Sequence, residues 1–380
     1  MFLRVPTMFF LAIVAAGCGV AHAPAQSTTP PRFVVHFIAL PGATADGVFM
    51  DYLAYDRAHH RVWVPAGNTG SVDVVDASND KLAQVEGFRI AEVERRGTKR
   101  TVGPSSATVG DGVVYIGNRG DSSVCAVDAA SLQIGPCVTL DASPDGLAYV
   151  AAAQEVWATT PRDNALVILD ASAAGALKRK TKIILDGRPE GFAVDDGRGV
   201  FYINLEDKDR TLTIDVKSRQ VTRTWPSGCG ADGPKGLALD HRLDFLFVAC
   251  RDRVTVLDAG HDGKPLSTIA VGDGVDNIEY VERRHELYAA AARAATLSIA
   301  RLDPQGGLAP IATVPTVAGA RNAVATDEGT AYLTDSSGGK LLVVAPAKPT
   351  QSGRAPAMDK SVVLGTEDRS YVARLAASTS

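Results

Sequence analysis

The sequence has little of what marks several large protein classes. Its apolar runs are short, and residues 8–16, near the N-terminus, fall far below the roughly 20 residues of a membrane-spanning helix. The formal net charge is only −4, so no strong field favours nucleic acid or an anionic membrane. No stretch has the period of a long amphipathic helix. These absences indicate a globular chain with no transmembrane segment and no strong nucleic-acid signal.

Common catalytic motifs are absent as well. The histidines form neither an H-E-x-x-H motif nor a zinc-ligand spacing. No C-x-x-C, G-x-S-x-G or Walker A motif occurs. The segment GCGADG at residues 228–233 matches G-x-G-x-x-G, but it precedes a predicted strand and not a helix, so the dinucleotide-binding context is missing. We therefore assign no catalytic residue and favour a non-enzymatic role over an enzymatic one.

The N-terminal segment has the form of an export signal. Arg4 precedes the apolar run, and small residues follow it. Cleavage after Ala25 by the A-x-A rule gives a signal peptide at residues 1–25 and a flexible linker at residues 26–32. The alternative is a lipobox-like segment with Cys18 as a lipid anchor, although Ala15 stands where leucine is usual. We predict a periplasmic or secreted bacterial protein.

A repeat organises the rest of the chain. Seven related segments begin at residues 50, 104, 144, 189, 234, 275 and 321, and from residue 104 on their starts are about 40–46 residues apart. In the fourth, PEGFAVDDGRGVFYINLEDKDRTLTIDV, apolar runs alternate with turns rich in Asp and Gly. Each segment predicts three clear strands and a weaker fourth. The pattern predicts an all-β fold, a seven-bladed β-propeller with four antiparallel strands per blade at residues 33–346.

The two ends of the repeat region predict how the ring closes. The last segment has three clear strands, whereas FVVHFIAL at residues 33–40 belongs to no repeat. If this N-terminal strand pairs as the outer strand of the last blade, it closes the ring and covers a sheet edge. Residues 347–380 are rich in Pro, Ala, Ser and Gly, and predict a partly disordered tail.

Several phrases resemble a known family. PDGLAYVAAAQEVWATTPRD, the fourth repeat and GPKGLALD, followed by GVDNIEY and GARNAVA, are similar to the WD40-like, YVTN-type seven-bladed propellers of bacterial exported proteins. The resemblance covers roughly residues 33–346 and implies the fold and export. It implies little chemistry, although some relatives resemble ligand-binding or lactonase-like propellers.

The repeat places one polar position of every blade at the mouth of the central channel, just before the first strand. That position holds Asp51, Ser105, Asp145, Glu190, Lys235, Asp276 and Asn322, with Arg188, Asn277 and Arg321 beside it. Convergent polar groups are typical of a binding site, although any propeller has a hydrated polar mouth. We predict ligand binding by Asp51, Asp145, Glu190, Lys235, Asp276, Asn277, Arg321 and Asn322.

A second polar position lies at the ends of the second strands, at Asn68, Asn118, Asn204 and Asp335. The alternative hypothesis is a Ca²⁺-type lactonase-like hydrolase whose cation is held at the channel mouth by Glu190, Asn204 and Asn277, since carboxylate and amide oxygens suit this ion. A repeat-wide Asn is more often a turn residue, because its side chain bonds nearby backbone. Glu206, Asp207 and Asp209 are likewise interpreted as solvated turn residues.

Four cysteines follow the signal segment. Cys125 and Cys137 fall on the third and fourth strands of one blade, while Cys229 leads into the fifth blade and Cys250 ends its second strand. Disulfides persist in oxidising compartments, and their short reach excludes pairing between separate blades. We predict the disulfides Cys125–Cys137 and Cys229–Cys250. Taken together, these sequence features predict an exported monomeric propeller with no required cofactor. We expect it to bind a small-molecule ligand or a protein partner on one face.

Overall fold

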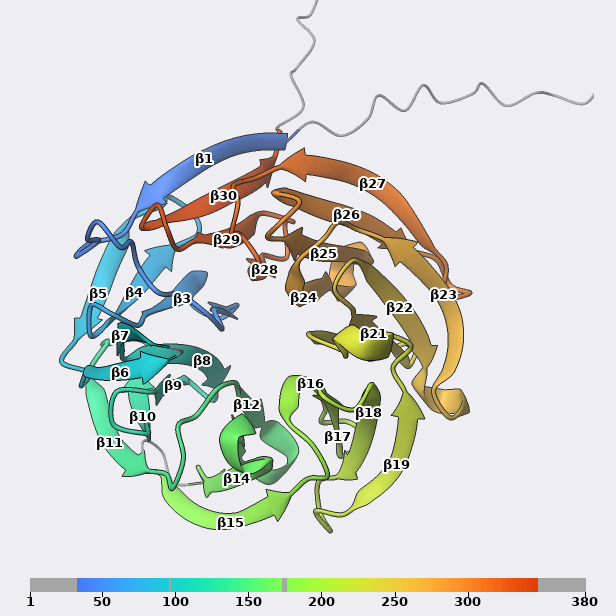
Figure 1. The fold of residues 1–380 in the computed structure, drawn as a ribbon, viewed down its shortest axis with the longest axis horizontal. Helices are drawn as coiled ribbons and strands as arrows, with labels where there is room; N and C mark the ends of the chain where they lie inside the picture. The colour runs from blue at the N-terminus through green and yellow to red at the C-terminus, as the bar shows by residue number, and fades with distance from the viewer. Residues whose placement is uncertain (1–32, 96, 173–175, 348–380) are drawn as a thin grey trace, which may run out of the picture. The chain divides into compact units, whose positions relative to one another are not determined.

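The computed structural model describes residues 33–95, 97–172 and 176–347. The predicted signal peptide, the linker, Cys18 and residues 348–380 of the predicted tail lie outside these residues. Between residues 33 and 346 the strands form seven four-stranded antiparallel sheets arranged as blades around a central channel (Figure 1). The predicted seven-bladed propeller is therefore confirmed. No helix in the described part of the chain is long and apolar enough to cross a membrane.

The blades follow the chain, and each runs from an inner strand at the channel to an outer strand at the rim. Blades one to three consist of β2 (Ala54–Asp56), β3 (Arg61–Ala66), β4 (Ser71–Asp76) and β5 (Leu82–Glu86); β8 (Pro104–Gly110), β9 (Val113–Asn118), β10 (Ser123–Asp128) and β11 (Ile134–Thr139); and β12 (Leu147–Val150), β13 (Glu155–Thr160), β14 (Ala165–Asp170) and β15 (Lys178–Ile184).

Blades four to six repeat this order. They consist of β16 (Pro189–Asp195), β17 (Val200–Leu205), β18 (Arg210–Asp215) and β19 (Val221–Pro226); β20 (Leu237–Asp240), β21 (Phe245–Ala249), β22 (Arg253–Asp258) and β23 (Lys264–Ala270); and β24 (Val275–Val281), β25 (Glu286–Ala291), β26 (Thr296–Leu302) and β27 (Leu308–Pro315). Short 3₁₀ turns occur at Ala151–Ala153, Pro161–Asp163, Gly230–Asp232, Ala259–His261 and Glu282–Arg284.

Blade seven closes the ring with a strand from the other end of the chain. It contains β28 (Ala323–Ala325), β29 (Ala331–Asp335) and β30 (Lys340–Pro346), and its outer strand is β1 (Phe33–Ala39). β1 pairs antiparallel with β30 from Phe33 opposite Pro346 to Ala39 opposite Lys340. The predicted closure is confirmed, and it covers the outer edge of β30 with backbone hydrogen bonds.

Turn chemistry explains why the strands break where they do. An Asp at the end of an inner or third strand accepts hydrogen bonds from the backbone of the turn that follows. Asp76 Oδ1 accepts from Ser78 N at 2.8 Å, Asp215 Oδ1 from Ser218 N at 2.7 Å and Asp240 Oδ1 from Leu243 N at 2.9 Å. Such side-chain bonds favour a turn over a continued strand.

The glycine of the phrases PDG, PEG and PKG permits neighbouring inner strands to approach closely around the channel. A Cβ on Gly146 would lie 2.4 Å from the Phe192 ring, and one on Gly191 would lie 2.2 Å from Lys235 O. A Cβ on Gly236 would lie 2.7 Å from Asn277 Oδ1. The repeat therefore carries glycine here because a larger residue would push adjacent blades apart.

The core lies between adjacent blades, where second strands present large apolar side chains. Trp63, Trp157, Phe201, Phe247, Tyr288 and Tyr332 are all at most 1% exposed. Trp157 of blade three stacks on Phe201 of blade four with ring centroids 4.7 Å apart. Each blade thus buries its apolar face against the next, so the ring has many similar cores and no single centre.

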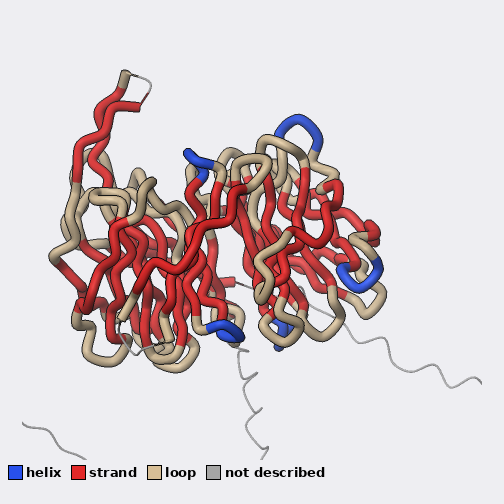
Figure 2. The backbone as a smooth tube through the Cα atoms, turned by 90° about the horizontal axis from the view of Figure 1, so that it is seen from below, coloured by secondary structure: helices blue, strands red, loops and turns tan. Residues whose placement is uncertain are grey.

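A two-stranded ribbon interrupts the regular plan between blades one and two. β6 (Ala91–Arg95) pairs with β7 (Thr98–Val102), and the ribbon projects beyond the blades (Figure 2). It connects the outer strand of blade one with the inner strand of blade two. It therefore stands on the face where inner strands begin, which we call the upper face.

Candidate functional site

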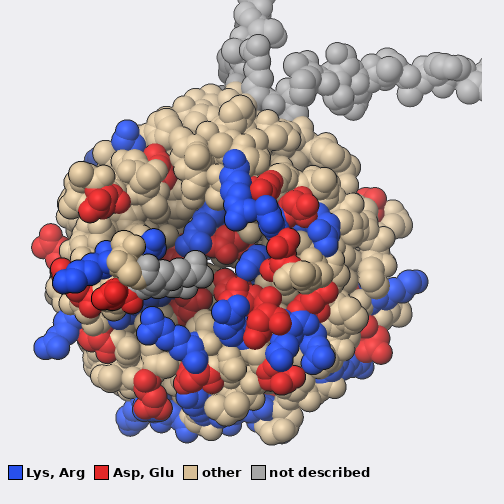
Figure 3. All heavy atoms as spheres, in the orientation of Figure 1, with Lys and Arg blue, Asp and Glu red and all other residues tan. Residues whose placement is uncertain are grey.

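The upper end of the channel brings the predicted ring positions together. Backbone bonds link them between adjacent blades: Tyr52 N donates to Ser105 O at 3.0 Å, and Gly236 N donates to Asp276 O at 2.7 Å. Acidic and basic side chains gather around the central opening of this face (Figure 3). We call this group the charged mouth, and it consists of Asp51, Arg119, Asp145, Arg188, Glu190, Glu206, Lys235, Asp276, Arg321 and Asn322.

Five side chains of the charged mouth form one chain of ion pairs across five blades. Arg119 at the end of β9 pairs with Asp51 at 2.8 Å and also contacts Asp145. Arg321 pairs with Asp51 at 3.3 Å and with Asp276 at 2.9 Å. Burial opposes the charge of Arg119, yet Asp51 and Asp145 raise the pKa of its guanidinium above the ordinary value. These carboxylates are therefore matched by cations within the protein.

Asn322 fixes the carboxylate shared by both arginines. Its Nδ2 donates to the backbone oxygen of Asp51 at 2.9 Å and to Asp51 Oδ1 at 3.1 Å. Asn322 is 3% exposed, so these bonds lie in a region of low dielectric where they are strong. The predicted residues Asp51, Arg321 and Asn322 thus act as one hydrogen-bonded unit.

A second group of charges lies between blades four and five. Lys235 Nζ pairs with Glu206 Oε2 at 3.0 Å, and Arg188 Nε lies 3.4 Å from Glu206 Oε1. Glu206 lies in the turn as predicted, but its interpretation as a solvated residue is wrong, because its side chain is only 20% exposed and pairs with Lys235. Asp207 and Asp209 do lie in the turn, where they accept hydrogen bonds from Arg188 N and Cys229 N.

Glu190 differs from the other acids of the charged mouth. Among the described residues its carboxylate makes no ion pair, and its one hydrogen bond comes from Tyr52 Oη at 3.5 Å. Burial raises its pKa well above the ordinary value, and the nearby carboxylates of Asp145, Asp276, Glu206 and Asp51 raise it further. Glu190 therefore gives up its proton less readily than an ordinary glutamate.

Tyr52 belongs to the site although the sequence did not single it out. It extends from blade one across to blade four, where its ring stacks on Phe192 with centroids 6.0 Å apart. Burial, and then the charge of Glu190, raise the pKa of its hydroxyl well above the ordinary value. Tyr52 therefore stays a neutral hydrogen-bond donor to Glu190.

The repeat-wide asparagines are structural. Asn204 is fully buried, and its amide donates to Lys235 O at 2.7 Å and accepts from Thr211 Oγ1 at 2.7 Å. Asn118 likewise donates to Arg89 O at 3.0 Å. Each amide thus ties the end of a second strand to an adjacent loop of the upper face.

These bonds bear on the calcium hypothesis. The amide of Asn204 is already used, and Asn277 Oδ1 accepts from the backbone N of Ile278 at 3.0 Å. No group of three or more His, Cys, Asp or Glu side chains within residues 33–95, 97–172 and 176–347 is arranged to hold a metal ion. Asn204 and Asn277 would have to give up these bonds to bind Ca²⁺, and the calcium site of Glu190, Asn204 and Asn277 stays a prediction.

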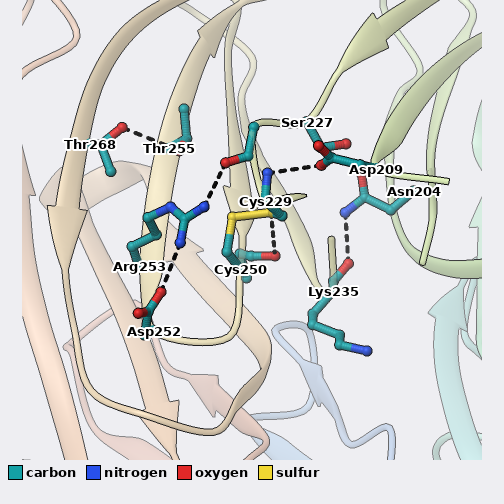
Figure 4. Close-up of a disulfide and its surroundings, with 12 residues drawn as sticks. Asn204, Asp209, Ser227, Cys229, Lys235, Cys250, Asp252, Arg253, Thr255 and Thr268 are labelled. Carbon is teal, nitrogen blue, oxygen red and sulfur yellow. Dashed lines mark hydrogen bonds and ion pairs between the residues drawn. A yellow bond between two sulfur atoms is a disulfide. The ribbon is translucent and has the colours of Figure 1, made fainter. Parts of the chain in front are cut away.

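Both predicted disulfides are present. Cys125 and Cys137 join β10 to β11 with Cα atoms 4.0 Å apart, and Cys229 and Cys250 have Cα atoms 5.2 Å apart. Figure 4 shows the second bridge beside the loop that carries Lys235. Cys229 N also donates to Asp209 Oδ1 at 2.8 Å. The bridge therefore holds the loop that leads from blade four into the charged mouth.

Comparisons with known proteins show the fold alone. No protein-family model matches the chain, and no curated protein matches it. Solved structures with a similar fold include a chain of the mitotic checkpoint complex, at 14% identity, a TM-score of 0.65 and coverage of 91% of this chain and 100% of that one. Hydrazine synthase of Kuenenia stuttgartiensis matches at 15% identity and a TM-score of 0.66, over 80% and 96% of the two chains. Virginiamycin B lyase of Staphylococcus aureus matches at 13% and 0.63, over 83% and 100%.

Proposed function

We propose that this chain is an exported propeller that binds, at its charged mouth, a hydrophilic ligand carrying a positively charged nitrogen. The observation that carries the proposal is Glu190, an acid of the charged mouth without an ion-pair partner among the described residues. The two disulfides support export, because such bonds persist in oxidising compartments.

The surrounding ion pairs support a binding role for Glu190. Asp51, Asp145 and Asp276 are held by Arg119 and Arg321, so their positions are set before any ligand arrives. A cationic ligand nitrogen at Glu190 would replace the proton of this acid and gain a charge-assisted hydrogen bond. Binding would then release a proton, and affinity would rise with pH.

The similar folds support a binding role without selecting a reaction. They include a chain of a multiprotein complex and two kinds of enzyme. Propellers host many functions, and function lies in the site that the fold presents. The site of this chain presents matched charges and one unmatched acid, which favours recognition of a cation over a catalytic dyad.

A melting experiment with spermidine as the probe tests the proposal. Spermidine is expected to raise the melting temperature, because a ligand of the native state stabilises it by mass action. Glu190→Gln should remove this rise, whereas Asp207→Asn, which removes an exposed acid of the adjacent turn, should keep it. An equal rise in all three proteins would mean non-specific attraction and would refute the proposal.

The calcium-dependent, lactonase-like alternative predicts a different result. Ca²⁺ would then raise the melting temperature, and lactones would be hydrolysed only with Ca²⁺ present. That outcome, with no effect of spermidine, would replace the proposed function by the alternative.

A further inference from the structure

The channel contains a cavity of about 290 Å³ below the charged mouth. Inner-strand residues of six blades line it, and most of them are apolar: Leu53, Ala107, Leu147, Phe192, Leu237 and Ile278. At ~30 Å³ per water molecule, the volume has room for about ten groups of that size. Polar atoms nevertheless make up most of the surface that lines this space, so the cavity suits one small organic molecule that carries a polar group as well as an apolar part.

Tyr52 forms the roof of this cavity. It lines the cavity, stacks on Phe192 of blade four and donates its hydroxyl to Glu190 at 3.5 Å. Because blades one and four lie on different sides of the ring, its side chain crosses the channel between the cavity and the charged mouth. The cavity therefore adjoins the charged mouth, and Tyr52 lies between the two.

The lower end of the cavity holds an acid that the fold does not neutralise fully. Glu279 on β24 lines the cavity, and its nearest cation is Arg57, whose Nη2 lies 3.7 Å from Glu279 Oε1. Arg57 also pairs with Asp327 at 3.1 Å. Among the described residues, the Glu279 carboxylate accepts no hydrogen bond within the usual distance. A carboxylate in such a place gains from a donor that a ligand supplies.

The groups around Glu279 set its protonation. Burial raises its pKa to about 7, with Arg57 lowering it and Asp327 raising it. Two nearby ionisable groups have partners of their own: Tyr280 on the same strand donates to Asp240, and Tyr288 on β25 donates to Glu286. Glu279 is therefore the titrating group that faces the cavity at this end.

We propose that the cavity binds a small aromatic amine, with its ring among Leu53, Phe192 and Ile278 and its ammonium group donating to Glu279. The aromatic ring of Tyr52 at the roof favours a planar ligand ring, whereas the Phe192 ring already stacks on Tyr52 and on Phe201. Arg57 is 54% exposed, so the lower face supplies the route of access. The site goes beyond the proposed function, because its acid is Glu279 and not Glu190 and its ligand carries an aromatic ring, although Tyr52 contacts both sites.

Benzylamine and benzyl alcohol test this inference in a calorimetric titration of the full chain. The two have nearly the same shape and differ in charge. Benzylamine should bind at least tenfold more tightly at pH 8, because a hydrogen bond to a charged group contributes more than a neutral one. Its affinity should fall about tenfold between pH 8 and pH 6, since the bound amine requires ionised Glu279.

Two variants separate this site from the charged mouth. Glu279→Gln should abolish the preference for benzylamine, while Glu190→Gln should leave benzylamine binding unchanged. Equal affinity for the amine and the alcohol in the native chain, or benzylamine binding that survives Glu279→Gln, would overturn the inference. Loss of benzylamine binding in Glu190→Gln would also overturn it, because the amine would then lie at the mouth. Failure of spermidine alone would refute only the proposed function.

Discussion

Two polar regions of this propeller surround a glutamate with very different partners. Glu155 of blade three is 0% exposed, and its carboxylate accepts from Arg219 at 2.6 Å, from Trp157 Nε1 at 2.9 Å and pairs with Lys180 at 2.7 Å. Glu190 of blade four, in the charged mouth, receives one long hydrogen bond from Tyr52. The carboxylate of Glu155 is neutralised by neighbouring cations, whereas that of Glu190 has no ion pair with any residue that the structure describes.

The two acids differ in the direction in which their surroundings shift the pKa. Burial alone would raise the pKa of Glu155, but hydrogen bonds from Lys180, Trp157 and Arg219 bring it below its ordinary value. For Glu190 burial and the surrounding acids act in the same direction and raise the pKa. Glu286 of blade six repeats the solution of Glu155, with Arg284, Tyr288 and Arg301 as its donors. The fold can therefore satisfy a buried glutamate, whereas the half-buried Glu190 has no ion pair among the described residues.

Removing a satisfied glutamate should have the largest effect on stability. Glu155→Gln should lower the free energy of unfolding by about 3 kcal/mol at pH 7, because it leaves Arg219 and Lys180 without their acid. The loss should shrink as pH falls below about 4, where the native carboxylate itself becomes protonated. Urea unfolding measures both, with exposed Glu86→Gln on β5 as the control. A change below about 0.5 kcal/mol would show that the hydrogen bonds and ion pairs of Glu155 do not stabilise the fold.

Replacing a buried acid that lacks a full set of hydrogen bonds should instead raise the free energy of unfolding. Asp73 on β4 is 0% exposed; its Oδ1 accepts from Gln84 at 2.8 Å, and Oδ2 has no partner among the described residues. Burial raises its pKa to about 6, so the folded chain binds a proton that the unfolded chain loses near pH 4. Stability is thus lost as pH rises from about 4 to 6.

Asp73→Asn removes that loss. It should stabilise the chain by about 2 kcal/mol at pH 7.5 and by almost nothing at pH 4. Urea unfolding at the two pH values measures the difference. Destabilisation at pH 7.5 would show that the carboxylate is satisfied in the folded chain.

The smallest expected effect is at the charged mouth. Glu190 also has a raised pKa in the folded chain, so its contribution to stability decreases as pH rises above its unfolded value of about 4.3. Because Glu190 is only half-buried, solvent offsets part of this cost, so Glu190→Gln should stabilise the ligand-free chain at pH 8 by about 1 kcal/mol and leave it unchanged at pH 4. Thermal unfolding at both pH values measures this effect. A loss of stability at pH 8 would show that the Glu190 carboxylate, like that of Glu155, stabilises the folded chain.

The fold could be predicted because the residues that determine each blade lie close together in the sequence. Each blade carries its own Asp and Gly turns and its own apolar strands, and the repeat register places one residue per blade at the channel. The unpaired strand at Phe33–Ala39 predicted the closure for the same reason. The two disulfides followed from strand order within single blades.

What could not be predicted depends on contacts across the ring. Tyr52 and Glu190 are 138 residues apart, and only the closed ring brings them into contact. Arg119 directly follows Asn118, so the sequence indicates only a turn residue. Its ion pairs with Asp51 and Asp145 form only in the closed ring. Glu206 was misread because other blades have varied residues in that turn, and its partner Lys235 comes from the next blade. The cavity results from side-chain packing of six blades, which no repeat pattern encodes.

The most direct test of the account is a calorimetric titration of the native chain with spermidine at pH 7, in two buffers of different ionisation enthalpy. If the ligand nitrogen replaces the proton of Glu190, the observed heats differ between the buffers and correspond to release of up to one proton per ligand. Glu190→Gln should then bind at least tenfold more weakly, without proton release. Equal heats in both buffers, or unchanged affinity in Glu190→Gln, would contradict the claim that the charged mouth binds a cation at Glu190.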